Sequence, residues 1–245
     1  MRSEPLRERG EGVRALFVTT DLDTLITALY VKIDDDLAGI RRVGRPPQLT
    51  DTTWIVDSTP VPCAMSRPSV KRSEPADWAS YGYCASQSRY FRGPRLYLVC
   101  TPTGIPVMGP LANAELGERE VLAAMLEVDT DLVADREKIL LISDKGFSSA
   151  PFERDLAGLG IELLRPSRKR EKERYGEPML KKVRQLIESV NDTLKGQLDL
   201  EEHGGQSIEG VAIRVAQRVL AMAAAIWHNN KTGQPTTRSL IAYDH

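Results

Sequence analysis

Three acidic residues of this chain have the types and the placement that metal-dependent chemistry requires. Asp57 lies inside the apolar run "TWIVDSTPV", Asp144 follows the apolar run "KILLIS", and Glu188 lies in "RQLIESVNDTLK". If the two runs are neighbouring strands, both Asp side chains lie at one end of a sheet, and Glu188 reaches them from a helix. Converging carboxylates repel one another unless a hard divalent cation such as Mg²⁺ neutralises them. The set therefore predicts phosphoryl transfer.

The segment around Glu188 predicts a helix with two different faces. Its apolar face has the three-and-four spacing of a stripe that packs on a core: Leu180, Val183, Ile187, Val190 and Leu194. Its polar face places four residues one above another: Arg184, Glu188, Asn191 and Lys195. Two interpretations of this polar face are open. It is either a solvated row of i, i+4 and i, i+7 charge partners, or a carboxylate held over a reacting centre.

The order of expected elements predicts an α/β fold. Apolar runs predict strands at 53–61, 95–100, 105–109, 138–143 and 161–166, and helical patterns cover 117–128, 151–160, 180–195 and 206–230. The second and third strands form a hairpin around a Pro-Thr-Gly turn, so we expect a mixed sheet rather than a fully parallel one. The segment 58–94 shows no clear period and is long for a connection, which is typical of functional or disordered loops.

Two stretches concentrate cationic side chains. The segment "RPSRKREKER" has six basic residues against two acidic ones: Arg165, Arg168, Lys169, Arg170, Lys172 and Arg174. The segment 58–94 carries Arg89, Arg92 and three further basic residues among five aromatic ones, which suits phosphate pairing with base or sugar stacking. In both cases a solvated loop is the alternative to a nucleic-acid contact.

Whole-chain properties exclude several classes of protein. The 245 residues, 41% of them hydrophobic, suffice for one main domain, and 33 basic against 34 acidic residues leave bulk charge uninformative about a polyanionic partner. No uninterrupted apolar run approaches the roughly 18 residues that span a bilayer, and the first residues lack the apolar core of a signal peptide, so we expect a soluble, cytoplasmic protein with no membrane partner. Cys63, Cys84 and Cys100 have no zinc-ligand spacing and are expected to be reduced structural thiols.

The beginning of the chain predicts one isolated helix rather than a domain. The stretch "TTDLDTLITALYVKIDDD" opens with a capping box at Thr20 and Asp23 and continues with an apolar stripe. It is followed by "RRVGRPPQLTD", which reads as an extended linker that runs directly into the first expected strand. We therefore expect residues 1–52 to be a residual helix and linker, and residues 53–245 to form a catalytic domain with a C-terminal helix.

Several motifs resemble the DDE transposases of bacterial insertion sequences, which belong to the ribonuclease-H-like and retroviral-integrase superfamily. Arg184, Glu188 and Lys195 match the Arg-x3-Glu-x6-Lys part of a signature that carries the third acid in this family, although Lys181 stands where the family has Tyr. The stretch "WIVDSTPV" looks like the first catalytic strand, and "ISDKGF" is similar to the element that carries the second acid. The phrases "GYCASQSRYFRG", "AIWHNN" and "RSLIAYDH" extend the resemblance over roughly residues 53–245.

The resemblance implies a fold, a cofactor and a set of site residues. The fold would be a ribonuclease-H-like mixed sheet flanked by helices, with a short N-terminal helical appendage. Asp57, Asp144 and Glu188 would be both the catalytic residues and the ligands of two Mg²⁺ ions, or of Mn²⁺ in their place. The implied activity is cleavage of DNA phosphodiesters at transposon ends and strand transfer into target DNA. The residues expected to contact DNA are Arg184, Lys195, Lys145, Arg165, Arg168, Lys169, Arg170, Arg89 and Arg92.

The resemblance also implies partners and exposes a missing part. The partner would be double-stranded DNA, both terminal repeats and target, and the active form would be a homo-oligomer. In similar full-length transposases a substantial helical segment separates the "GRPP" element from the first catalytic strand, whereas here the two almost meet. We therefore expect an internal deletion that impairs end recognition and assembly. The alternatives are a deletion remnant that binds DNA or transposase subunits without catalysing transposition, and a generic ribonuclease-H-like nuclease.

Overall fold

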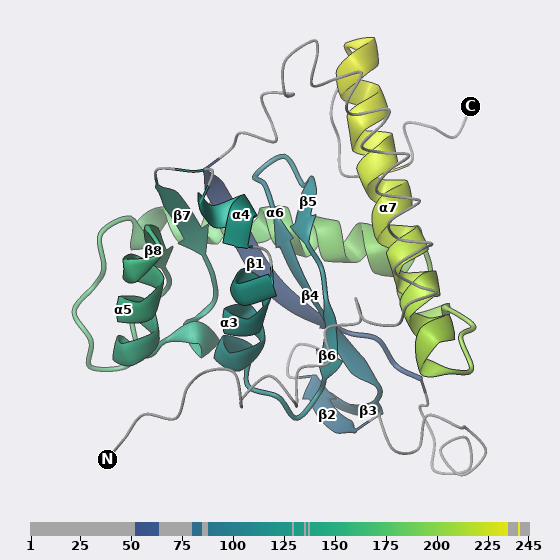
Figure 1. The fold of residues 1–245 in the computed structure, drawn as a ribbon, viewed down its shortest axis with the longest axis horizontal. Helices are drawn as coiled ribbons and strands as arrows, with labels where there is room; N and C mark the ends of the chain where they lie inside the picture. Colours follow the sequence, from purple (N-terminus) through teal and green to yellow (C-terminus); the bar gives the residue numbers. More distant parts are fainter. Residues whose placement is uncertain are drawn as a thin grey trace.

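The chain folds around a mixed β-sheet that has helices on both faces (Figure 1). The computed structural model describes residues 52–63, 80–84, 88–128, 130–134, 136, 138–234 and 240. The strands are β1 (Thr53–Pro60), β2 (Tyr81–Cys84), β3 (Arg89–Arg92), β4 (Pro94–Cys100), β5 (Pro106–Met108), β6 (Leu111–Asn113), β7 (Ile139–Ile142) and β8 (Ile161–Leu164). The helices are α3 (Glu118–Val128), α4 (Thr130–Ala134), η5 (Lys145–Phe147), α5 (Ala150–Gly158), α6 (Glu177–Gly196), η6 (Leu200–Glu202) and α7 (Ile208–Thr232).

The main sheet has the strand order β5-β4-β1-β7-β8, and β6 also pairs with β4. The pairs β5–β4 and β4–β1 are antiparallel, whereas β1–β7 and β7–β8 are parallel. A tight turn joins β4 to β5, where Gly104 has a φ of +90° and its N–H donates to the Thr101 carbonyl. The parallel strands need crossovers, which α3 with α4 and then α5 supply. The expected mixed sheet is therefore confirmed.

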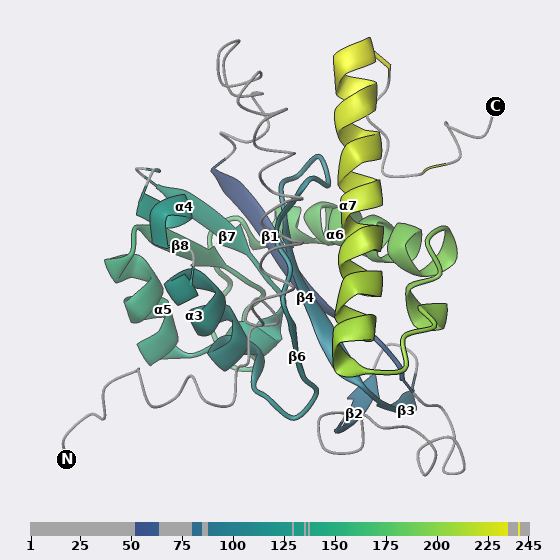
Figure 2. The same cartoon turned by 45° about the vertical axis from the view of Figure 1, so that its right-hand side comes forward.

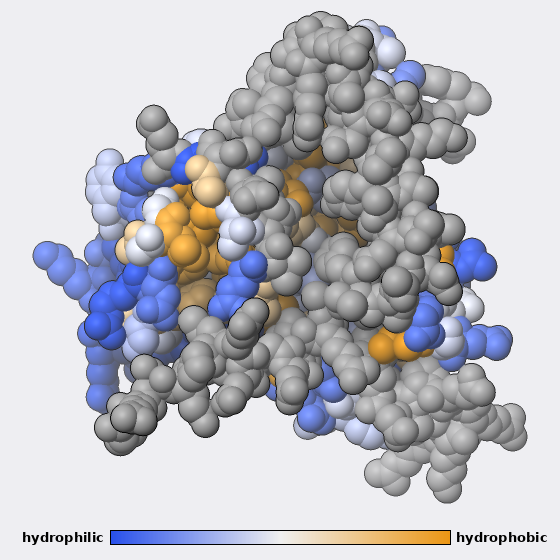
Figure 3. All heavy atoms as spheres, viewed as in Figure 1, coloured by the Kyte–Doolittle hydropathy of each residue, from blue (hydrophilic) through white to orange (hydrophobic). Residues whose placement is uncertain are grey.

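Alternating side chains of β1 divide the core into two halves. Trp54 and Val56 belong to the core under α3 and α5, whereas Ile55 belongs to the core under α6 and α7. The two helical layers lie on opposite faces of the sheet in both ribbon views (Figures 1 and 2). Hydrophobic side chains show between α3 and α5 in the space-filling view, bordered by hydrophilic ones (Figure 3). Even-numbered residues of β1 therefore face α3 and α5, and odd-numbered residues face α6 and α7.

The helix that carries Glu188 packs as the sequence predicts. In α6, Leu180, Ile187, Val190 and Leu194 are buried, and Val183 packs at the border of the same core. This apolar stripe packs α6 against the sheet and prevents the helix from rotating about its axis. The polar row beside the stripe therefore keeps one orientation relative to the sheet. The helical expectation at 180–195 is confirmed, and the structure extends the helix to Glu177–Gly196.

The segment 58–94, expected to lack regular structure, contains strands. The first strand ends at Pro60, as its apolar run predicts, but β2 and β3 form an antiparallel hairpin that was not expected. These strands are four residues long and carry exposed aromatic side chains, so they lack the apolar alternation that would identify them in the sequence. The structure therefore corrects the expectation for the described part of this segment.

Helix α7 is long and apolar. By length and composition alone, its stretch Ile208–Asn229 would suffice to cross a membrane, a property that core helices share. The search for uninterrupted apolar runs in the sequence missed this stretch because charged residues interrupt it. Val211, Val215, Met222 and Ile226 pack into the core beside α6.

The expectations for residues 1–51, including the isolated helix and the effect of the deletion, lie outside the described residues. Cys63, Cys84 and Cys100 form no disulfide.

Candidate active site

The parallel pairing of β1 with β7 brings Asp57 and Asp144 together. The register pairs Ile55 with Ile142, and continuing it by two residues places Asp57 beside Asp144, just beyond the end of β7. Neighbouring strands lie about 4.8 Å apart, so the two carboxyl-bearing residues meet at the carboxyl end of β7. The premise that these two strands are neighbours is thus confirmed.

Asp57 is held by its own backbone and by α6. The N–H of Ser58 donates to Asp57 Oδ1 at 2.8 Å, and Asn191 Nδ2 donates to Asp57 Oδ2 at 2.9 Å. Burial raises the pKa of Asp57 to about 6, and the negative charge of Asp144 acts in the same direction. The Ser58 N–H and the positive charges of Arg184 and Lys195 on α6 oppose this shift of the pKa. Asp57 therefore faces the polar row of α6.

Asp144 is fixed by a tight turn. It precedes the short helix η5, and its Oδ1 accepts the Gly146 N–H at 2.7 Å. Such a capping bond holds the side chain at the start of the turn and leaves its second oxygen available. Lys145 is exposed in the same turn, one residue from Asp144.

Glu188 shares the row of α6 that faces Asp57, but its described contact is with a neighbour on the helix. Arg184 Nη2 lies 3.6 Å from Glu188 Oε1, and both side chains are about half exposed. Asn191, on the adjacent turn, is the α6 residue that bonds to Asp57. Since residues three and four apart on a helix are surface neighbours, Glu188 lies between Arg184 and Asn191 above the same face of the sheet.

The donor atoms at this end of the sheet suit a hard cation, although the arrangement is incomplete. Among the described residues, no group of three or more His, Cys, Asp or Glu side chains is placed to hold a metal ion. Asp57 and Asp144 nevertheless supply only oxygen donors, and their mutual repulsion contributes to the raised pKa of Asp57. A divalent cation would replace that repulsion by attraction, so the chemistry of the pair fits Mg²⁺ or Mn²⁺.

A fourth acid, Glu118, lies beside both Asp-bearing segments and escaped the sequence analysis. Ser58 Oγ approaches Glu118 Oε1 at 3.4 Å and also accepts from Arg95 Nη1 at 3.2 Å. A Cβ atom at Gly146 would clash with Glu118 Oε2, so the carboxylate lies directly over the turn that holds Asp144. Burial raises the pKa of Glu118, and the charge of Asp144 adds to the shift. An acid in the first turn of a helix is common, so no sequence pattern marks Glu118 for this role.

The basic segment 165–174 contains one residue that is buried between acidic partners. Arg165 is only 4% exposed, and its guanidinium donates to Glu153 and, through two nitrogens, to Glu171. These bonds to Arg165 lower the pKa of Glu171 to about 2. Arg174 also binds both acids. The donors of Arg165 hold the loop to α5, which argues against the predicted DNA contact of this residue.

The remaining cations of this segment are at the surface. Arg168, Lys169 and Arg170 are exposed, and Arg168 additionally donates to the Ser148 carbonyl at 2.6 Å. Ser148 follows the turn that contains Asp144, so Arg168 ties the basic loop to that turn. Lys169, Arg170 and Lys172 are exposed on the same loop.

The other two expected cations lie on the hairpin and differ from each other. Arg89 is half-buried and pairs with Glu201, which follows α6 in the chain. Arg92 lies with its guanidinium 5.8 Å from the centre of the Tyr81 ring. Arg89 thus fastens the hairpin to the domain, whereas Arg92 belongs to its aromatic face.

The fold and the chain's family agree with one another. The sheet order, with two parallel strands after an antiparallel meander and helices on both faces, confirms the expected ribonuclease-H-like α/β fold. The model of the family described as "Transposase DDE domain" matches residues 49–224. The chain belongs to this family.

Comparison with other proteins gives distant similarities. One solved structure, the catalytic core domain of BIV integrase, is 12% identical with a TM-score of 0.39, and the match covers 70% of this chain and 82% of that chain. Another, a synaptic complex of piggyBac transposase with hairpin DNA, is 14% identical with a TM-score of 0.34, and the match covers 50% of this chain and 24% of that chain. No curated protein matches the chain.

Proposed function

We propose that the chain is the transposase of an insertion sequence, which cleaves phosphodiester bonds at the ends of the element and transfers the freed strand into target DNA. The observation that carries the proposal is the meeting of Asp57 with Asp144 under the Arg184–Lys195 face of α6. Membership of the Transposase DDE domain family supports the same assignment. Acting on chromosomal DNA would place the protein in the bacterial cytoplasm.

The residues of the proposed site divide the work. Asp57, Asp144 and Glu188 would hold two Mg²⁺ or Mn²⁺ ions, which when bound supply an activated water and neutralise charge that develops on the phosphate. Asn191 keeps the Asp57 carboxylate oriented toward the site through the bond to Oδ2. Glu188 would exchange its contact with Arg184 for the site, a rotamer change that a half-exposed side chain makes at small cost.

The cations around the acids would bind the substrate. Arg184, released from Glu188, presents a planar pair of donors to a phosphate, and Lys195 adds a point charge on the same face. Lys145 and the exposed cations of the basic loop, Arg168, Lys169 and Arg170, would extend the contact along the DNA backbone. A second copy of the chain would be needed to hold both ends of an element, so we propose a homo-oligomer as the active form.

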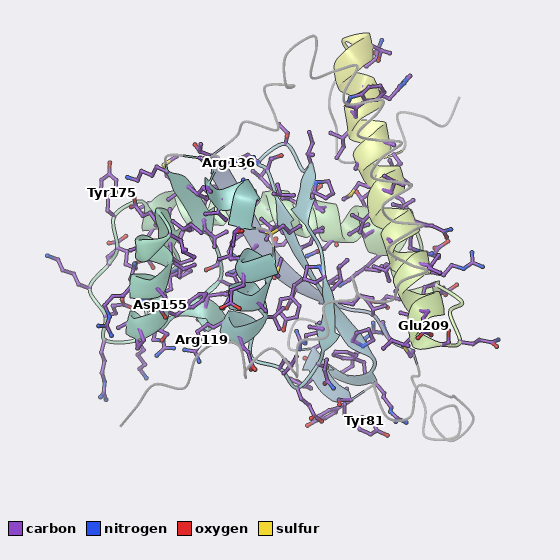
Figure 4. The ribbon with its side chains drawn as sticks, viewed as in Figure 1. Tyr81, Arg119, Arg136, Asp155, Tyr175 and Glu209 are labelled. Atoms are coloured by element: carbon purple, nitrogen blue, oxygen red, sulfur yellow. The ribbon has the colours of Figure 1, made fainter. Side chains whose placement is uncertain are left out.

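A cleavage assay tests the proposal. Labelled duplexes that carry the ends of the neighbouring element are incubated with the chain and Mn²⁺, Mg²⁺ or a chelator. We expect metal-dependent nicks with 3′-hydroxyl ends, lost in Glu188→Gln but kept in Glu209→Gln, a matched change in the first turn of α7, where Figure 4 labels Glu209. DNA binding by Glu188→Gln should persist, because the cations remain. Binding without any cleavage by the unmodified chain would instead establish the remnant that binds DNA without catalysis.

A further inference from the structure

The hairpin β2–β3 has one buried and one aromatic face. On the buried face, Phe91 is 2% exposed and packs against Gly82, where an added Cβ would clash with the Phe91 ring. This packing fixes the register, since a slip by one residue would turn Phe91 outward. The residues of opposite parity therefore point to solvent.

The outward face carries three tyrosines. Tyr81, Tyr83 and Tyr90 are 56%, 46% and 74% exposed, and Tyr81 points away from the domain in Figure 4. In the part of the chain that the structure describes, seven large hydrophobic side chains are exposed, and three of these seven lie on this short hairpin. A concentration of exposed aromatic rings on one small element marks an interaction surface rather than random exposure.

The arrangement of the rings suits stacking with planar partners. Tyr83 and Tyr90 are directly opposite in the ladder, with ring centres 5.0 Å apart and planes inclined by 53°. Because the two rings are tilted, they do not cover one another as a parallel stack would. A planar group can therefore lie on the outer side of either ring.

Charge identifies the kind of partner. Arg92 lies over the Tyr81 ring, and Arg95 lies over the Phe91 ring from the adjoining strand. The acid bonded to the hairpin, Glu201, is neutralised by Arg89. Aromatic rings interleaved with cations fit a polyanion that carries planar groups, which is a nucleic-acid strand. Rings stack on bases that have left the duplex, because paired bases already stack on each other.

The hairpin is connected to the proposed active site. Arg95 donates through Nη1 to Ser58 Oγ, next to Asp57, and through Nη2 to the Tyr83 carbonyl at 2.7 Å. The same guanidinium thus ties the tyrosine face to the strand that carries the first acid. A strand that lies on the hairpin would continue toward that end of the sheet.

We infer that Tyr81, Tyr83 and Tyr90 form a stacking surface for unpaired bases of a DNA strand near the cleavage site. The inference rests on the proposed function in its assumption that the chain binds DNA, but not on catalysis. It adds a preference for DNA whose bases are unpaired.

Fluorescence anisotropy with a chelator present tests the inference without cleavage. The probes are a labelled duplex, the same duplex with a central unpaired stretch, and the unpaired stretch with abasic positions. We expect the unmodified chain to bind the unpaired probe more tightly than the duplex, by about fivefold to a hundredfold for one stacked base. The abasic probe keeps the flexible backbone but offers no bases, so it should lose this preference.

Variants assign the preference to the rings. Tyr83→Ala with Tyr90→Ala should abolish it while leaving duplex binding unchanged, and Tyr83→Phe with Tyr90→Phe should keep it. Tyr175→Ala removes a fully exposed tyrosine on a different loop and should keep the preference as well. A thermal melt of each variant verifies folding, which these exposed positions should not disturb.

Three results would overturn the inference. Equal binding of paired and unpaired probes by the unmodified chain would refute the stacking surface alone. Binding of no probe would refute both this inference and the DNA binding in the proposed function. Loss of self-association rather than of DNA preference in the alanine variant, seen by light scattering, would make the tyrosine face a contact between copies of the chain.

Discussion

Placing a methyl group at Gly146 tests whether Glu118 lies over the turn of Asp144. Gly146 has no positive φ, so alanine fits the backbone and should stabilise the fold by about 0.4–1 kcal/mol through the unfolded state. The new Cβ, however, would clash with Glu118 Oε2 and force that side chain from its position. An off-rotamer side chain costs about 0.5–1.5 kcal/mol, and the weak contact with Ser58 at 3.4 Å would be lost too.

These opposing effects predict that the stability change caused by Gly146→Ala depends on whether Glu118 is present. With Glu118 present, Gly146→Ala should be neutral or destabilising by about 1 kcal/mol, and in Glu118→Ala it should be more favourable by the removed clash. The close approach of the new Cβ to Asp144 Oδ1, 2.9 Å, is common to both backgrounds and cancels. The coupling free energy should therefore be about 1–2 kcal/mol, within the range of residues in contact.

Urea denaturation of the four proteins of this cycle gives the coupling directly. The midpoints and slopes are compared under one buffer condition, without divalent metal, so that binding at the acids does not contribute. The same effect of Gly146→Ala in both backgrounds would refute the placement of Glu118. Independent folding evidence comes from circular dichroism of each variant.

Three further predictions concern stability and binding. Leu194→Ala, in the fully buried stripe of α6, should lower the free energy of unfolding by about 2–5 kcal/mol in urea denaturation, and an effect below about 1 kcal/mol would contradict the packing of α6 on the sheet. Burial of His203 lowers its pKa from 6.5, so its contribution to stability is present above pH 6.5 and is lost as the pH falls below that value. His203→Gln should therefore make the melting temperature less dependent on pH between about 7 and 5. An unchanged dependence would exclude this histidine as its source. Arg165→Met should destabilise the fold without changing the salt dependence of DNA affinity, whereas Lys169→Met should leave stability unchanged and reduce the salt slope by about one, and the reverse pattern would contradict the burial of Arg165.

The sequence predicted the strands and helices in which apolar residues recur with a regular spacing. The apolar runs around Ile55 and Leu141 are buried on both faces of the sheet, and α6 has a continuous stripe that includes Ile187 and Leu194. Such patterns arise because long elements bury a whole face, and the same burial fixes which residues stand at their ends. The positions of Asp57 and Asp144 at one end of the sheet therefore follow from the sequence once β1 and β7 are neighbours.

The remaining features depend on contacts between residues far apart in the chain. Glu118 meets Ser58 across 60 positions, and no local pattern marks that approach. Arg165 resembles its basic neighbours in sequence, but Glu153 and Glu171 draw it into the protein. The hairpin β2–β3 escaped detection because its strands are short and its tyrosines are exposed rather than buried.

The most direct test of the central claim is anomalous diffraction from crystals of the protein that contain Mn²⁺. The claim is that Asp57, Asp144 and Glu188 form one metal-dependent site for DNA cleavage. We predict Mn²⁺ bound by the carboxylates of Asp57 and Asp144, with Glu188 turned away from Arg184 to become a ligand. No anomalous signal at these carboxylates, or a signal there with Glu188 still paired to Arg184, would contradict the account.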